Sequence, residues 1–395
     1  MSRWRGPGPG LIVAAAFIGP GTVTTATLAG ANFGLSLLWA LAFATVATII
    51  LQEMSARLGL VTGSGLGTAL KAVGGPSWVG VTLAGLGVGA VVSGAVAFQA
   101  GNLTGAGLGL SGVFGQTPRV WAVLGALLAA TLLWTGRYQL VERTLAVCVA
   151  VMGLVFLATA IMVAPSVGEL MSGIALPTVP SDPTLVIALI GTTIVPYNLF
   201  LHAATVRERW NGPEHLPAVR RDLVIAIVAG GIVSGAVVVT ASAALGGAPI
   251  TSATDMAQQL EPLLGRGAAW AFAAGFAAAG ISSAITAPLA AAYATIDVIG
   301  RPRDVRSLPA RAVWGGTIAI GAVVTLIGFR PVPLIVFAQV INGLILPLVA
   351  AVLLIAMNDR ARLGPHVNTW KGNLIGAIVV LLCFGLGLRS ILRAL

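Results

Sequence analysis

Long apolar runs recur along the whole chain and are separated by short polar stretches. Most approach or exceed the roughly 20 residues that a helix needs to cross the hydrocarbon core of a bilayer. Because lipid offers the backbone no hydrogen-bond partners, such segments must be helical. The pattern therefore predicts an all-α integral membrane protein with eleven spans. These are residues 10–33, 36–58, 78–100, 119–135, 140–164, 184–210, 220–244, 267–299, 309–328, 332–356 and 371–393, of which the first and sixth are interrupted.

The composition excludes a soluble protein. Hydrophobic residues make up 57% of the chain and charged residues only 9%, whereas a soluble domain carries roughly 25% charged residues. We expect one transmembrane domain over residues 1–395, surrounded by the lipid bilayer. The sequence contains no Ser/His/Asp constellation, cysteine cluster or pair of mid-membrane carboxylates. It therefore predicts neither an enzyme nor a bound cofactor, and it leaves the oligomeric state open.

The basic residues are distributed unevenly between the two sides of the predicted bundle. With the spans above, 17 of the 22 Lys and Arg residues fall on one side and 5 on the other. Such an excess on short loops marks the cytoplasmic side. We expect a multi-pass protein of the inner (plasma) membrane, with its N-terminus in the cytoplasm and its C-terminus outside. The net charge of +10 is then a signal of topology, and nucleic-acid binding is not expected.

Two of the spans contain helix-breaking sequences at matching positions. Gly19–Thr22 (Gly-Pro-Gly-Thr) interrupts the first span and Val195–Asn198 (Val-Pro-Tyr-Asn) the sixth. A lone proline in a membrane helix usually produces only a kink, but glycine and proline together favour unwinding. Equivalent breaks in two five-span runs of opposite orientation indicate an inverted repeat with a transport site between the breaks. We expect repeats over residues 1–164 and 184–356, followed by an extra helix over residues 371–393.

The residues around these breaks resemble the Nramp family of metal-ion transporters along nearly the whole chain. The similarity includes the two breaks, the Gln52–Gly59 stretch, Gly191–His202, Ala279–Thr286 and the Gln339…Pro347 pair. The resemblance implies the LeuT-type (APC) fold, with two inverted five-helix repeats, an eleventh helix and alternating access. It also implies that the substrate binds at the breaks.

The chain departs from the family where the family binds metal. The family's Asp, Asn and Met ligands correspond to Gly19, Thr22 and Val195, and the family's His corresponds to Tyr197. The family's acidic pair in the third span falls on Gly87 and Ala90. No acidic residue lies at mid-depth of a predicted span; the nearest, Glu53 and Asp297, lie close to cytoplasmic ends. We therefore expect neither tight binding of a bare metal ion nor the family's proton route.

The candidate substrate-binding residues are those of the breaks and their expected neighbours: Ala16, Gly19, Pro20, Gly21, Thr22, Thr192, Val195, Pro196, Tyr197, Asn198 and Gln339. Three interpretations remain open. The first is a weakly bound or partly hydrated divalent cation, held by neutral oxygens such as those of Thr22 and Asn198. The second is a small organic solute, such as an amino acid, whose carboxylate would bind at the Gly-Pro-Gly break, because free N–H groups there favour an anion. The third is a relative that does not transport.

Three further polar residues carry two interpretations each. His202 lies one turn after Asn198 and is either a packed, hydrogen-bonded residue or a proton or gating residue. Gln339 and Asn342 share one face of their span at i and i+3. Buried amides in membranes usually hold helices together. The resemblance favours a substrate contact for Gln339, and packing remains the expected role of Asn342.

Overall fold

The computed structural model describes residues 18–73, 77–136, 138–301 and 303–394. The described residues form helices and their connections, without strands, which confirms the predicted all-α class. Ten helical stretches among them are long and apolar enough to cross a membrane. The first predicted span is represented by α2 (Pro20–Phe33). Ala16 and the rest of that span's first half lie outside the described residues.

The remaining helices follow the predicted spans closely, and short helices connect some of them. The long helices are α3 (Leu38–Thr62), α5 (Ser77–Phe114), α6 (Pro118–Thr135), α7 (Tyr138–Val163), α11 (Leu216–Ala244), α14 (Ala268–Ile299), α15 (Leu308–Ile327), α16 (Pro331–Met357) and α18 (Trp370–Ala394). The sixth span is divided into α9 (Thr184–Thr193) and α10 (Pro196–Thr205). The short helices are α4 (Leu66–Lys71), α8 (Val167–Ala175), α12 (Ala253–Ala257), α13 (Glu261–Leu264) and α17 (Arg360–Leu363).

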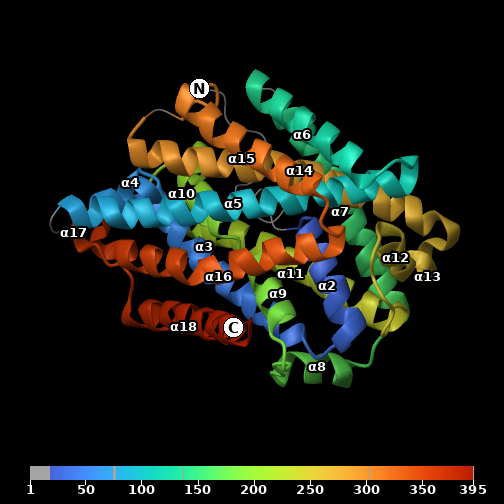
Figure 1. Cartoon of the computed structure of the whole chain (residues 1–395). Coiled ribbons are helices and arrows are strands. Elements are labelled where there is room, and N and C mark those ends of the chain that lie inside the picture. Colours follow the sequence, from blue (N-terminus) through green and yellow to red (C-terminus); the bar gives the residue numbers. More distant parts are fainter. Residues whose placement is uncertain (1–17, 74–76, 137, 302, 395) are drawn as a thin grey trace.

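Helix α5 runs through the middle of the bundle and packs against α14, α15 and α16 (Figure 1). Its predicted end at residue 100 was wrong, because the helix continues to Phe114. The added segment is rich in glycine and less apolar, but it remains helical because it is packed on several sides. Gly105 lies against Pro20, and Gly109 lies against the backbone of Ala273 and Ala277 in α14. Tertiary packing thus extends a helix that hydropathy alone would end.

The bundle is apolar on its outside and carries its polar side chains within. Large apolar side chains are exposed on the peripheral helices, including Leu127 on α6, Leu154 and Ile161 on α7 and Leu381 on α18. Buried polar side chains gather on the central helices: Gln52, Gln99, Asn102, Thr192, Asn198, His202, Gln339 and Asn342 are each at most 2% exposed. This arrangement suits a protein whose solvent is lipid.

Glycine allows α2 to approach α11 closely. A Cβ atom at Gly30 would lie 2.8 Å from the Ala241 Cβ and would overlap the Val238 carbonyl oxygen. Val238 and Ala241 are both fully buried on α11, so neither can move away without displacing that helix.

We expect Gly30→Ala to lower thermal stability, because overpacking a dense interface costs about 1–3 kcal/mol. The matched control is Gly89→Ala on α5, where a Cβ atom would meet nothing within 4 Å. Thermal unfolding of both purified variants in detergent checks the prediction. Equal midpoints for the two variants would contradict it.

Candidate functional site

The second break lies where the sequence predicts it. Helix α9 ends at Thr193, Ile194 and Val195 have non-helical backbone angles, and α10 begins at Pro196. Proline supplies no N–H and disfavours the helical conformation of the residue before it. In the first span α2 begins at Pro20 after an extended Gly19. The described part of this span is thus a half-helix that starts at the predicted position.

The two breaks lie side by side, and α16 completes the contact. The Thr22 hydroxyl lies 2.8 Å from the Thr192 hydroxyl. The Gln339 side chain packs directly on Gly21, where a Cβ atom would lie 2.7 Å from Gln339 Oε1 and closer still to its nitrogen. The Gln339 carbonyl packs equally closely on Gly191. The sequence-predicted residues from three separate spans therefore meet in one place.

Several polar atoms on α10 and α16 are buried without a hydrogen-bond partner among the described residues. They include Tyr197 Oη, Asn198 Oδ1 and Gln339 Oε1, on side chains that are each about 1% exposed. Leaving a buried polar group unpaired costs roughly 1–3 kcal/mol. Together with the contacts between the three spans, these groups make this the candidate site.

The site has no formal negative charge. Among the described residues, no group of three or more His, Cys, Asp or Glu side chains could hold a metal ion. Glu53 pairs with Arg57 at 3.1 Å, as its i, i+4 spacing predicts, and with Arg220 at 2.8 Å. Asp297 pairs with Arg303 at 3.5 Å. The two acidic residues nearest the core are thus neutralised by arginines.

His202 is placed on the α3 side of α10. Its Nδ1 lies 2.9 Å from Gln52 Oε1, and both side chains are 1% exposed. This contact is the one that the packing interpretation requires. A proton or gating role for His202 stays a prediction.

Two further buried polar residues lie outside the set of candidate substrate-binding residues drawn from the sequence. Asn102 has an unpaired Nδ2, and it lies beyond the predicted end of its span, so it was not considered as a buried residue. Ser283 on α14 lies beside Gly19, with Oγ 2.9 Å from the position of a Cβ there. The position of Ser283 beside the first break could be expected only from the resemblance, because a serine in a helix often hydrogen-bonds to its own backbone.

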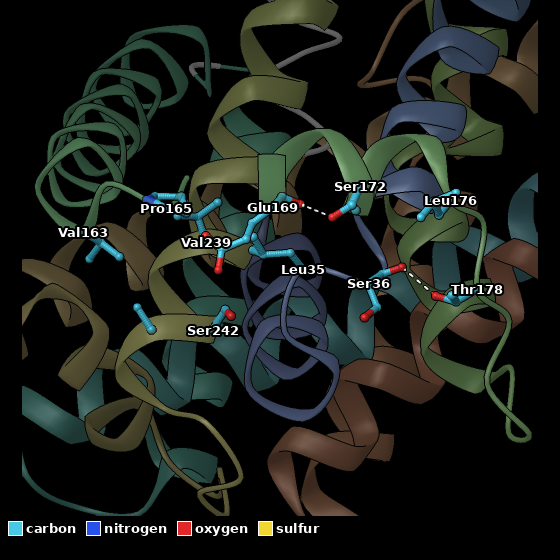
Figure 2. Close-up of a pocket in the computed structure, with 12 residues that line it drawn as sticks. Leu35, Ser36, Val163, Pro165, Glu169, Ser172, Leu176, Thr178, Val239 and Ser242 are labelled. Carbon is cyan, nitrogen blue, oxygen red and sulfur yellow. Dashed lines mark hydrogen bonds between the residues drawn. The ribbon is translucent and has the colours of Figure 1, made fainter. Parts of the chain in front are cut away.

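Two cavities lie away from the breaks. One, of about 530 Å³, is bordered by α8 and the connection after α2 (Figure 2). In it the Ser172 hydroxyl donates to the Glu169 carbonyl and the Thr178 hydroxyl to the Ser36 carbonyl. Hydrogen bonds from the Ser166 side chain and backbone hold the pKa of the Glu169 carboxyl below its usual value.

The second cavity, of about 640 Å³, lies on the approach to the site. Val340 in its wall adjoins Gln339, and Leu28 lies seven residues after Gly21, or about 10 Å along α2. Its walls are mainly apolar, and Arg330 is the one charged side chain among its lining residues. Neither of these two cavities is lined by residues of the breaks.

Comparison with known proteins places this architecture in a family. Residues 10–393 match the family model described as natural resistance-associated macrophage protein-like (Nramp). A divalent metal cation transporter MntH of Aeromonas hydrophila is 29% identical, over 96% of this chain and 93% of that protein. A MntH of Klebsiella pneumoniae is 28% identical, over 94% of this chain and 90% of that protein.

Solved structures agree on the fold. A manganese transporter of Eremococcus coleocola superposes with a TM-score of 0.79 at 22% identity, covering 97% of this chain and 85% of that one. MhsT in complex with L-phenylalanine gives a TM-score of 0.64 at 17% identity, with both chains fully covered. Both likenesses confirm the LeuT-type fold. The match to the family model over nearly the entire length shows that this chain belongs to the Nramp family.

Proposed function

We propose that this chain is a secondary transporter that carries a divalent metal cation across the inner membrane by alternating access and holds the ion in partly hydrated form. The observation that carries the proposal is the set of neutral oxygens, Tyr197 Oη, Asn198 Oδ1 and Gln339 Oε1, buried without partners at the break. The family and the printed descriptions of its relatives as divalent metal cation transporters support the choice of substrate.

The chemistry of these groups sets how the ion is held. Hydroxyl and amide oxygens suit hard cations, but neutral oxygens alone do not offset the cost of fully dehydrating a dication in a medium of low dielectric constant. An ion that keeps part of its water shell avoids most of that cost, and Mg²⁺ is especially reluctant to lose its waters. Val195 provides no thioether sulfur. The site therefore has no ligand that prefers Mn²⁺ to Mg²⁺.

We propose further that transport is not coupled to protons by the family's route. Gly87 occupies the position of one of the family's acidic residues. A Cβ atom there would lie 3.1–3.5 Å from the side chains of Phe200, Leu70 and Val352, an apolar environment without a proton acceptor. The positive-inside rule further supports a cytoplasmic N-terminus and an external C-terminus.

The cavity at Arg330 favours a second candidate, the carrier of a small organic anion or zwitterion. Apolar walls with a single cationic side chain would suit a ligand with a carboxylate and an apolar body. Thermal stabilisation of the purified protein by amino acids, with no response to Mg²⁺ or Mn²⁺, would favour this candidate. If neither the amino acids nor the two metal ions change the thermal stability, a relative that does not transport would be favoured.

For the metal proposal we expect Asn198→Ala to weaken Mg²⁺ and Mn²⁺ binding by about tenfold to a hundredfold, because a polar contact to a charged group contributes roughly 1.5–3 kcal/mol. Thr22→Ala should act in the same direction. Titration calorimetry of the purified protein measures the change. The controls are Asn211→Ala and Thr131→Ala, both exposed and far from the breaks in sequence. Equal affinity in the site and control variants would count against the proposal.

Uptake of either metal into proteoliposomes should proceed without acidification of the lumen. The physical reason is that the candidate site residues include no carboxylate, and the two acidic residues nearest the core, Glu53 and Asp297, pair with arginines. A metal-sensitive and a pH-sensitive dye in the lumen record both fluxes, and a protonophore sets the background. Proton entry in fixed proportion to metal entry would refute uncoupled transport.

A further inference from the structure

Three glycines form a stripe along α5 that faces the candidate site and continues away from it. Gly101, Gly94 and Gly87 are spaced seven residues apart, so they stay on one face of the helix with a drift of only about 20° per heptad. All three are buried. We call this face the glycine stripe.

Each glycine of the stripe faces a different neighbour. A Cβ atom at Gly101 would lie 3.8 Å from Gln339 Nε2, in the candidate site. At Gly94 it would lie 2.6 Å from Asn342 Oδ1. At Gly87 it would meet Phe200, Leu70 and Val352. The stripe thus runs from the candidate site, past the Asn342 side chain, to a cluster of apolar side chains. We call this cluster, formed by Phe200, Leu70 and Val352, the closure.

Asn342 is the feature that points to a ligand. Its side chain is completely buried, and both Oδ1 and Nδ2 have no hydrogen-bond partner among the described residues. A role in holding helices together would require such a partner, and the neighbouring helix instead presents a bare glycine. An amide left unpaired in the membrane interior costs roughly 1–3 kcal/mol for each group. The structure tolerates that cost at a position one helical turn beyond Gln339.

The closure beyond Asn342 lies on the face that the positive-inside rule assigns to the cytoplasm. Phe200 belongs to α10, the half-helix that begins at the break, and Leu70 belongs to α4. Beyond them, Asp297 accepts hydrogen bonds from the Thr68 backbone and hydroxyl, at 3.0 and 3.1 Å. An ion at Asn342 would therefore sit between the break and a closed inner end.

We propose that Asn342 is an inner coordination position for the partly hydrated divalent cation, reached after the break and before the cytoplasmic exit. Gly94 brings the α5 backbone directly against Asn342 Oδ1, so no side chain of α5 separates that helix from the amide. This inference rests on the proposed function, since it takes the cation as the substrate. It adds to that function a second position for the ion along the transport path. The oxygen donor at this position belongs to Asn342, whose expected role from the sequence was packing.

The test measures Mn²⁺ and Mg²⁺ uptake into proteoliposomes for Asn342→Leu, a change of similar volume that removes both polar atoms. We expect maximal uptake to fall at least tenfold, while the KM changes less than threefold because the donors at the break are intact. Asn342→Asp should lower the KM about tenfold and also slow turnover, because a carboxylate there would retain the dication.

Gly94→Ala provides an independent variant, with Gly89→Ala as its matched control. A methyl group at Gly94 would fill the stripe against Asn342, whereas a Cβ atom at Gly89 would meet nothing within 4 Å. We expect uptake to fall in the first variant only. Thermal midpoints of all variants separate a loss of transport from a loss of folding.

The outcomes are distinguishable. If the wild-type protein takes up neither metal, the proposed function and the inner position are both rejected. If the wild type transports and Asn342→Leu transports equally fast, only the inner position is overturned. A KM unchanged in Asn342→Asp would likewise reject it, because a purely structural role for Asn342 predicts no change in affinity.

Discussion

The structure depends on one constraint, the lack of water to satisfy polar groups inside a bilayer. The break at Ile194 and Val195 frees backbone groups from the helical ladder at a depth where lipid cannot pair with them. Such a break is tolerated only inside protein, and here α2 and α16 enclose it through Thr22 and Gln339. Glycines at 21 and 191 make the enclosure tight, because any side chain there would overlap Gln339. The site follows from this requirement for enclosure.

The same constraint governs charge. Glu53 and Asp297 lie near helix ends, where Arg57, Arg220 and Arg303 pair with them. Among the described residues, the polar side chains buried at the centre are amides, hydroxyls and His202. A dication in such a centre gains modest stabilisation from each neutral oxygen, so a hydrated and weakly held ion fits better than a stripped one. Weak binding also favours release, which a carrier needs as much as capture.

Much of this fold was predictable from sequence, because span length and helix-breaking residues each reflect a single physical rule. Pro196 predicts the second break, and the pair Glu53 and Arg57 follows from their spacing. The end of α5 and the environment of Asn342 were not predictable. Both depend on which helices lie beside α5, and hydropathy carries no information about neighbours distant in sequence. Asn342 appears as a packing residue until Gly94 is seen opposite its amide.

A neutral site changes the energetics of the transport that we propose. A binding carboxylate would carry its negative charge back through the membrane field when the empty carrier returns, whereas a neutral site leaves the returning carrier uncharged. Here the full charge of a dication would move, and the field does about 2.3 kcal/mol of work per elementary charge per 100 mV. Two charges give about 4.6 kcal/mol, enough to support an accumulation of more than about a thousandfold. The membrane potential alone can therefore drive uptake, and the replacement of the family's acidic residues by Gly19, Gly87 and Ala90 is compatible with an active carrier.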